Sequence, residues 1–233
     1  MRRVASTIAL VMCCTDSALA QKEKSDVADL PLIEIVAPHA SRTIAVFLSG
    51  DGGWAAIDKA IAGALKKRGV SVVGINSLKY FWRTRTPDGV AADVSRVIAH
   101  YRKAWRADTV IAIGFSRGAG VLPFVVNRLA ADSRGSVALV ALVGAERTAG
   151  FKFHPLDLLG MGSNKGEPPV LPEIEKLNGV PIICFYGEKE DDTLCPELKE
   201  PHVSVKLPGG HHMDGNYAAI GDRILDQLSG KKP

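Results

Sequence analysis

The sequence has few of the features that would assign it to a special class of protein. It contains no low-complexity tract and no internal repeat, and its longest apolar stretches are too short to span a bilayer. There is no dense block of lysine and arginine, so the formal net charge of +4 does not indicate a nucleic-acid binder. A composition of 46% hydrophobic and 23% charged residues in a chain of 233 indicates one ordinary globular domain.

The first twenty residues have the pattern of an export signal. Arg2 and Arg3 precede the apolar stretch 4–14, and residues 18–20 (Ala-Leu-Ala) form a small-x-small cleavage site. We expect residues 1–20 to be removed on translocation, which places the chain in the periplasm if the host is bacterial. An uncleaved anchor is the weaker interpretation because the apolar stretch is short.

A lipoprotein site at Cys13 or Cys14 is conceivable, but Met12 is a poor small residue ahead of Cys13. Loss of the leader would leave two cysteines, Cys184 and Cys195. In an oxidising compartment an even pair favours a disulfide. The alternative is a buried strand cysteine and an unrelated loop cysteine.

Apolar and helical segments alternate along the rest of the chain. This alternation predicts a mostly parallel sheet covered on both faces, with residues 21–42 as a flexible lead-in and first strand and 43–233 as one domain. Residues 145–178 are irregular and predict a small insertion over the carboxyl edge. The expected strands are 31–38, 43–49, 70–75, 110–113, 136–144, 180–187 and 203–207, and the expected helices cover roughly 57–68, 86–105, 119–131 and 214–228.

A G-x-S-x-G motif joins one of these buried strands to the helix after it. In Gly114-Phe115-Ser116-Arg117-Gly118, the serine stands between two glycines, as in the nucleophile elbow of α/β-hydrolases. Small neighbours let strand and helix pack closely around a strained turn. We therefore expect the α/β-hydrolase fold with Ser116 as nucleophile, the alternative being an ordinary turn serine.

Candidates for an acid and a base follow the last two strands, in the chain order that this fold uses. After the strand ending at Gly187, Asp192 lies four residues before Pro196 and is the expected acid. Asp191 is the close alternative, and Glu188 and Glu190 stand in the same acidic run, which could also be only solvated.

His211 directly follows the glycine pair 209–210 and is the expected base, with His212 as the alternative. Doubled histidines also raise the possibility of a metal site. The sequence offers neither H-x-x-x-H nor clustered cysteines, so we expect no metal and no cofactor. The remaining histidines, His100, His154 and His202, are expected at the surface or in structural positions.

An oxyanion hole needs two backbone N–H donors. One is expected from Arg117, which follows the nucleophile. The other is expected from Asp51 or Gly52, in the glycine-rich loop after the strand 43–49.

Several compound motifs together resemble the VirJ/AcvB family of exported bacterial α/β-hydrolases. These are LSGDGGW (48–54), LKYFW (78–82), GFSRGA (114–119), FYGEKEDDTLCP (185–196) and GGHHMDGNY (209–217). The resemblance extends from Thr43 to the C-terminus, at the length of single-domain VirJ-type members. Met213 stands where the family often has phenylalanine.

The resemblance implies a periplasmic serine esterase that removes lysine from lysyl-phosphatidylglycerol, with Ser116, Asp192 and His211 as the triad. It implies a phospholipid surface as partner, a possible link to type IV secretion proteins, and no direct nucleic-acid contact. Gly52 and Lys79 are expected in substrate binding, Lys79 either on the lipid phosphate or simply paired with Asp51. Acids that could meet the lysyl ammonium are Asp51, Glu146, Glu188, Glu190 and Asp214.

Two other functions fit the same scaffold. One is a generic exported carboxylesterase or thioesterase, since a fold does not fix its substrate. The other is a non-catalytic accessory protein of secretion. Tyr80, Phe81 and Trp82 either reach a membrane interface or pack on the sheet, and packing is the safer expectation.

Overall fold

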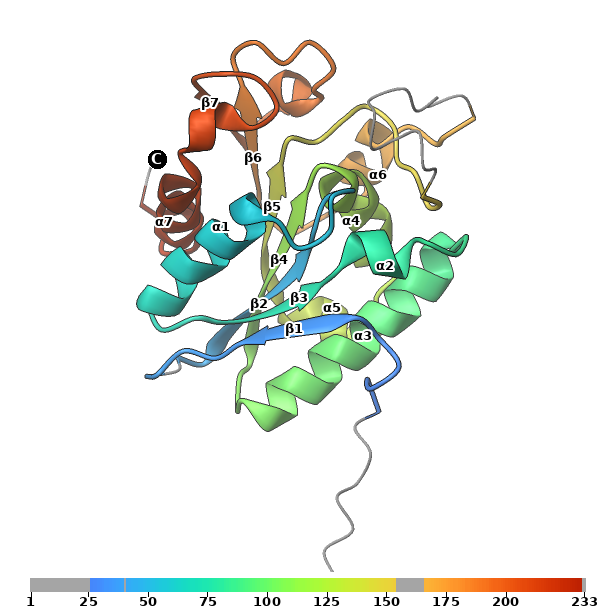
Figure 1. The fold of residues 1–233 in the computed structure, drawn as a ribbon, viewed down its shortest axis with the longest axis vertical. Coiled ribbons are helices and arrows are strands. Elements are labelled where there is room, and N and C mark those ends of the chain that lie inside the picture. The colour runs from blue at the N-terminus through green and yellow to red at the C-terminus, as the bar shows by residue number, and fades with distance from the viewer. Residues whose placement is uncertain (1–25, 40, 154–165, 232–233) are drawn as a thin grey trace, which may run out of the picture.

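A single twisted sheet forms the centre of the molecule (Figure 1). The computed structural model describes residues 26–39, 41–153 and 166–231, so the predicted leader lies outside the described residues. Within these ranges seven strands pair in the order β1-β3-β2-β4-β5-β6-β7. All neighbouring pairs are parallel except β1 with β3, which is antiparallel. The strands are β1 Leu32–Ile35, β2 Thr43–Leu48, β3 Ser71–Ile75, β4 Thr109–Phe115, β5 Val137–Val143, β6 Ile182–Gly187 and β7 Val203–Leu207.

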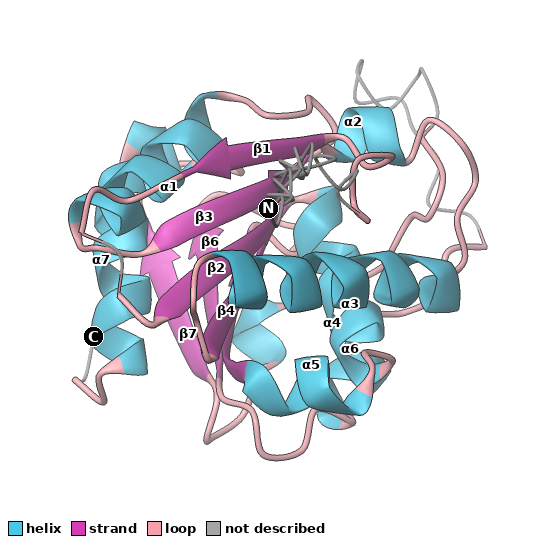
Figure 2. Cartoon of the chain, turned by 90° about the horizontal axis from the view of Figure 1, so that it is seen from below, coloured by secondary structure: helices cyan, strands magenta, loops and turns pink. Residues whose placement is uncertain are grey.

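Helices cover both faces of this sheet. Figure 2 shows α1 and α7 on one face and α3, α4, α5 and α6 on the other. This arrangement confirms the α/β-hydrolase fold predicted from the sequence. The helices are α1 Ala56–Lys67, α2 Ser77–Tyr80, α3 Pro87–Ala104, α4 Arg117–Asn127, α5 Ala131–Ser136, α6 Leu171–Glu175 and α7 Tyr217–Leu228.

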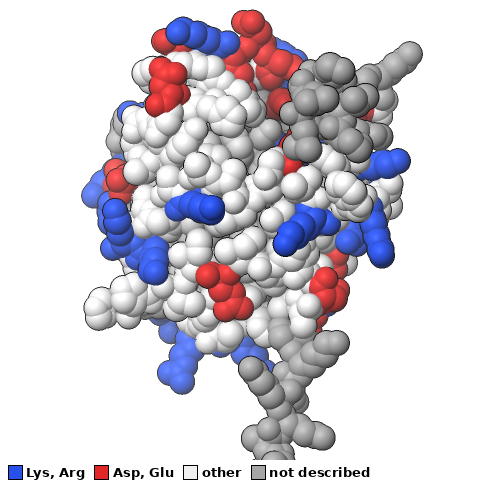
Figure 3. Space-filling model, viewed as in Figure 1, with Lys and Arg blue, Asp and Glu red and all other residues white. Residues whose placement is uncertain are grey.

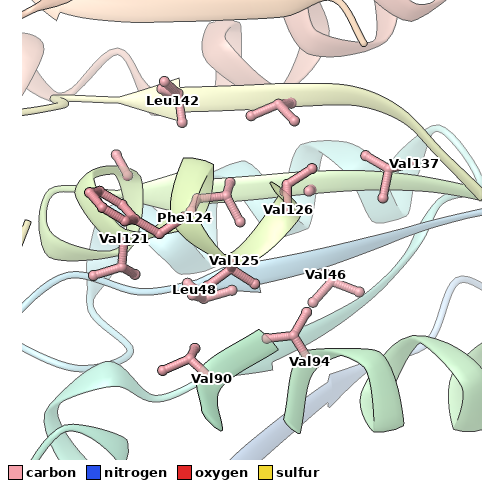
Figure 4. Packing of buried hydrophobic residues seen from close by; sticks show 14 of the residues in the cluster. Val46, Leu48, Val90, Val94, Val121, Phe124, Val125, Val126, Val137 and Leu142 are labelled. Atoms are coloured by element: carbon pink, nitrogen blue, oxygen red, sulfur yellow. The ribbon is translucent and has the colours of Figure 1, made fainter. Parts of the chain in front are cut away.

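The inner strands β2 to β6 are almost entirely apolar because successive side chains enter two different cores. In β2, Val46 and Leu48 face α3 and α4, whereas Phe47 faces α1 and α7. Figure 4 shows the first of these cores, where side chains of α4 lie between those of β2, α3 and β5. Helix α4 is buried along nearly its whole length. This burial fixes the position of Ser116, the residue that precedes the helix.

Short elements differ from the sequence-based expectation. Helix α2 forms inside the expected loop 76–85, capped by the Asn76 side chain, which accepts the Lys79 amide. Helices α5 and α6 were also not expected, and part of the predicted insertion, residues 154–165, lies outside the described residues. Residues 26–30 are not a flexible lead-in. Val27 is buried in the core, and Asp29 pairs with Arg96 of α3 at 2.6 Å.

The expected disulfide joins Cys184 in β6 to Cys195, eleven residues later, and the alternative of two unrelated cysteines is excluded. Both half-cystines are fully buried. The bond closes a loop that begins in β6 and contains Glu188, Glu190, Asp191 and Asp192. Among the described residues, there is no helix with the length and apolar character needed to cross a membrane.

Candidate active site

Ser116 occupies the sharp turn between β4 and α4. Its backbone angles are φ 51° and ψ −118°, in a region that non-glycine residues rarely adopt. The Ser116 amide donates to the carbonyl of Val143 at 2.9 Å, which fixes the turn to the end of β5. The residue is half-buried and lies at the carboxyl edge of the sheet, where this fold binds ligands.

The two glycines of the motif are required by close backbone contacts. A Cβ placed on Gly118 would overlap the carbonyl oxygen of Leu48, and one placed on Gly114 would overlap the carbonyl oxygen of Gly118. The turn therefore brings the first residues of α4 against the ends of both β2 and β4. This close approach is the physical reason for glycine on either side of the serine.

His211 is held by a carboxylate from the neighbouring loop. Its Nδ1 lies 2.6 Å from Oε1 of Glu190, and the other carboxylate oxygen of Glu190 accepts the Gly187 amide at 3.2 Å. The Glu190 side chain is only 7% exposed. A bond at Nδ1 fixes the orientation of the ring and leaves Nε2 for a second partner.

The imidazole of His211 lies beside the serine turn. Its ring centroid is 5.4 Å from that of Phe115, the residue before Ser116. On its other side is Gly144, where a Cβ would come within 2.8 Å of the imidazole. The absence of a side chain at Gly144 thus makes room for the imidazole of His211, which the sequence analysis did not predict.

The structure does not place Asp192, the predicted acid, against His211. The Asp192 side chain is 60% exposed and faces Arg147, at 3.6 Å from its Nε. Asp191 is exposed as well. The chain turns immediately after β6, because the Glu190 amide donates to the Gly187 carbonyl, and this turn brings Glu190 inward before the two aspartates are reached.

The alternative base, His212, is exposed, with its ring 5.9 Å from that of Phe115. No hydrogen bond or ion pair of its side chain is found within the described ranges. The structure therefore brings together Ser116, His211 and Glu190. The sequence predicts Ser116 as the nucleophile and His211 as the base, and Glu190 was named only as a member of the acidic run.

The glycine-rich loop after β2 lies against the serine. Gly50 is so close that a Cβ there would be 3.3 Å from the Cβ of Ser116. The loop closes on itself through the Gly53 amide, which donates to the Gly50 carbonyl at 3.1 Å. This position agrees with the predicted use of the Asp51 or Gly52 amide as an oxyanion donor, with the Arg117 amide at the start of α4 as the second.

The Arg117 side chain has a role that the sequence analysis missed. Its guanidinium pairs with the Asp51 carboxylate and donates to the carbonyls of Gly150 and Lys152, both at 2.9 Å. Only 7% of this side chain is exposed. Arg117 therefore fixes the loop after β2 and the segment after β5 beside Ser116.

Glu146, three residues beyond β5, contributes a second carboxylate near His211. Burial raises its pKa; the charge of His211 opposes this shift, whereas those of Asp192, Asp51 and Glu167 add to it. In the part of the chain that the structure describes, no hydrogen bond or ion pair engages its side chain. Negative charge at this site is thus in excess over positive charge.

The other predicted binding residues lie further out. Lys79 is exposed on α2 and lines a separate groove with Trp82 and Arg83, and the carboxylate of Asp51 pairs with Arg117, not with Lys79. Gly52 is exposed in its loop. Among the described residues, no group of three His, Cys, Asp or Glu side chains is placed to hold a metal ion.

A family model described as "Bacterial virulence protein (VirJ)" matches residues 42–232 of the chain. The chain belongs to the VirJ family. The match covers strands β2 to β7 and, within the described residues, helices α1 to α7; only β1 lies outside it. The VirJ-family assignment therefore applies to the domain that carries Ser116 and His211. No curated protein matches the sequence.

Solved structures similar to this VirJ-family chain share its fold at low sequence identity. Est1E from Butyrivibrio proteoclasticus has a TM-score of 0.61 and 13% identity, covering 85% of this chain and 94% of its own. MenH from S. aureus has a TM-score of 0.62 and 11% identity, covering 85% and 98%. An alpha-beta serine hydrolase homologue from Coxiella burnetii has a TM-score of 0.56 and 16% identity, covering 84% and 90%.

Proposed function

We propose that this VirJ-family protein is an exported serine hydrolase that cleaves the aminoacyl ester of lysyl-phosphatidylglycerol, releasing lysine and phosphatidylglycerol. The observation that carries the proposal is the His211 imidazole, hydrogen-bonded to Glu190 and lying beside the Ser116 turn. A nucleophile on a strained turn, a base and a buried acid are the parts that acyl transfer requires.

The chemistry proceeds through a lysyl-enzyme. The Ser116 hydroxyl attacks the lysyl carbonyl while His211 takes its proton, and the resulting oxyanion is held by backbone amides. The bond to the glycerol oxygen then breaks, and His211 returns the proton to that oxygen, which leaves as phosphatidylglycerol. Water, activated by the same imidazole, attacks the acyl-enzyme and releases lysine, restoring Ser116.

The charge around the site favours a cationic acyl group. Glu146 is a partly buried carboxylate close enough to His211 to interact with it, and Asp51 lies in the adjoining loop. Figure 3 shows acidic side chains gathered at the top of the molecule, where the loops after β6 lie. A lysyl group carries two ammonium groups, and binding one beside Glu146 would relieve the excess of negative charge.

The decisive assay supplies the purified protein with vesicles that contain lysyl-phosphatidylglycerol and measures free lysine. Alanyl-phosphatidylglycerol and a neutral soluble ester are compared in parallel. We expect the lysyl lipid to be preferred. Equal turnover of all three substrates would instead indicate a generic carboxylesterase, and no hydrolysis of any would favour the non-catalytic accessory role.

A Glu146→Gln variant tests the origin of the preference. We expect its KM for the lysyl lipid to rise at least about tenfold, because a hydrogen bond to a charged group is lost, whereas turnover of the neutral ester should change little. Glu188→Gln is the matched control, since that carboxylate is exposed in the loop after β6.

The activity should decline on the acid side at a higher pH than for an ordinary histidine. Burial lowers the pKa of His211, but the hydrogen bond and charge of Glu190, with the charges of Glu146 and Asp51, outweigh it, so the pKa is raised. Only the neutral imidazole can accept the serine proton, so kcat/KM should fall as pH drops through this raised pKa.

The pH profile of kcat/KM for a neutral ester measures that midpoint. Glu146→Gln should move it to lower pH, because one of the charges that favour the imidazolium is removed. A midpoint below the ordinary histidine value, or one unmoved by the substitution, would contradict this account.

A further inference from the structure

The indole of Trp82 is exposed, whereas most large apolar side chains of the described residues are buried. Trp82 is 64% exposed, and among the described residues only Val36, at 49%, joins it in the class of exposed large hydrophobic residues. Its neighbours Tyr80 and Phe81 are buried, as the sequence analysis expected of all three aromatic residues. Tryptophan in such a position is typical of surfaces that meet the interfacial layer of a membrane.

The exposed indole is supported by a built platform. It stacks on Phe153, with ring centroids 5.5 Å apart and an interplanar angle of 21°. Backbone hydrogen bonds join the two segments on either side: the Phe153 amide donates to the Phe81 carbonyl at 2.9 Å, and the Arg85 amide donates to the Phe151 carbonyl at 2.9 Å. The ring is thus held outward by its neighbours.

This platform continues into the active site. The segment that supports Trp82 accepts hydrogen bonds from the Arg117 guanidinium at the carbonyls of Gly150 and Lys152. Arg117 directly follows Ser116 in the chain. A surface that docks through Trp82 would therefore lie at the rim of the same edge of the sheet that carries the nucleophile.

The side chains around Trp82 give this rim a positive charge. Lys79, Arg83 and Lys152 are exposed, and no ion pair joins any of them to a carboxylate within the described residues. Lys79, Trp82 and Arg83 line one groove, of about 640 Å³. In Figure 3, basic side chains lie over α2 and the loop that follows it, on the right of the molecule.

The carboxylates near this groove are already neutralised. Asp29, which also lines it, pairs with Arg96 at 2.6 Å. Asp93 pairs with Arg96 at 2.9 Å and accepts the Tyr80 hydroxyl at 2.6 Å. The cations of the rim thus remain available for an anionic partner.

We propose that Trp82, Lys79, Arg83 and Lys152 form a docking surface for an anionic phospholipid bilayer. The indole enters the interfacial layer, and the three cations lie against lipid phosphates. The inference rests on the proposed function in one respect: the proposed substrate is a lipid of the same bilayer to which the protein would dock. Docking itself involves no turnover and is measured independently of it.

Co-sedimentation of the full chain with vesicles tests the proposal. Vesicles of phosphatidylglycerol and phosphatidylethanolamine are compared with vesicles of phosphatidylcholine alone. We expect the affinity for the anionic vesicles to fall roughly tenfold or more in Trp82→Ala, because the buried indole is lost. In the double variant Arg83→Gln/Lys152→Gln it should fall about fivefold for each charge removed. Every variant carries the same apolar stretch 4–14, so differences between variants report on the docking surface.

A charge-matched control removes two exposed lysines at the opposite edge of the sheet, in Lys66→Gln/Lys67→Gln at the end of α1. This control should bind as the wild type does. Equal loss in the control, or undiminished binding in Trp82→Ala, would overturn the proposal. Failure of the wild-type protein to bind anionic vesicles would also overturn it. The surface around Trp82 would then be better explained as a contact for another protein.

The two proposals fail separately. Absence of lysine release with intact, Trp82-dependent vesicle binding would overturn the esterase proposal and support docking. If lysine is released but all variants bind vesicles equally, the docking proposal is overturned and the esterase proposal is supported. Thermal unfolding of each variant verifies that the fold is retained.

Discussion

Ser116→Ala is expected to lower ester turnover by about a millionfold, the scale seen when a catalytic serine of this kind is removed. The substitution deletes only the hydroxyl that attacks the ester. The half-buried position accepts the smaller side chain, and alanine meets the same positive φ as serine, so backbone strain is unchanged. Single-turnover kinetics with the lysyl lipid or a neutral ester measures the loss, and the melting temperature should stay within a few degrees of the wild type.

Ser41→Ala serves as the matched control, since that exposed serine precedes β2 at the amino edge of the sheet. Its turnover should equal that of the wild type. A Ser116→Ala protein that keeps a tenth or more of its activity would remove Ser116 from the nucleophile role, whatever its neighbours do.

Glu190→Gln is expected to lower kcat about ten-thousandfold, whereas Asp192→Asn should change it less than about twofold. The carboxylate of Glu190 accepts from Nδ1 of His211, and a carboxamide can present its N–H₂ there and favour the wrong tautomer. Asp192 contributes only a 3.6 Å ion pair with Arg147 at the surface. Steady-state kinetics on both variants separates the two acids directly.

The opposite pattern, with a large loss in Asp192→Asn and none in Glu190→Gln, would return Asp192 to the triad and require the loop to rearrange during catalysis. Glu190→Asp adds a further check. It keeps the charge but shortens the side chain, so it should recover part of the activity that the carboxamide loses.

The sheet and its order along the chain could be predicted because β2 to β6 are buried on both faces and read as apolar runs. Ser116 and His211 could be predicted for a related reason. Each stands beside glycines at the end of a strand, where backbone approach leaves little freedom of placement.

The acid could not be predicted in the same way, because the choice among neighbouring acids depends on the path of a short turn. The hydrogen bond from the Glu190 amide to Gly187 sets that path, and no residue spacing reveals it. Gly144 was not predicted because neither its positive φ of 59° nor the space that it leaves for His211 has a signal in the sequence. The packing of residues 26–30 was not foreseen because Val27 and Leu30 are isolated among polar residues, and their burial depends on the core that α3 helps to form.

The Cys184–Cys195 bond makes the segment that contains Glu190 a covalent ring. In the chain-entropy view, such a ring removes about 3 kcal/mol of freedom from the unfolded chain. A newly synthesised polypeptide has no such ring until an oxidant forms it. The stability of the fold that places Glu190 beside His211 therefore includes a contribution made by an oxidation step after translation.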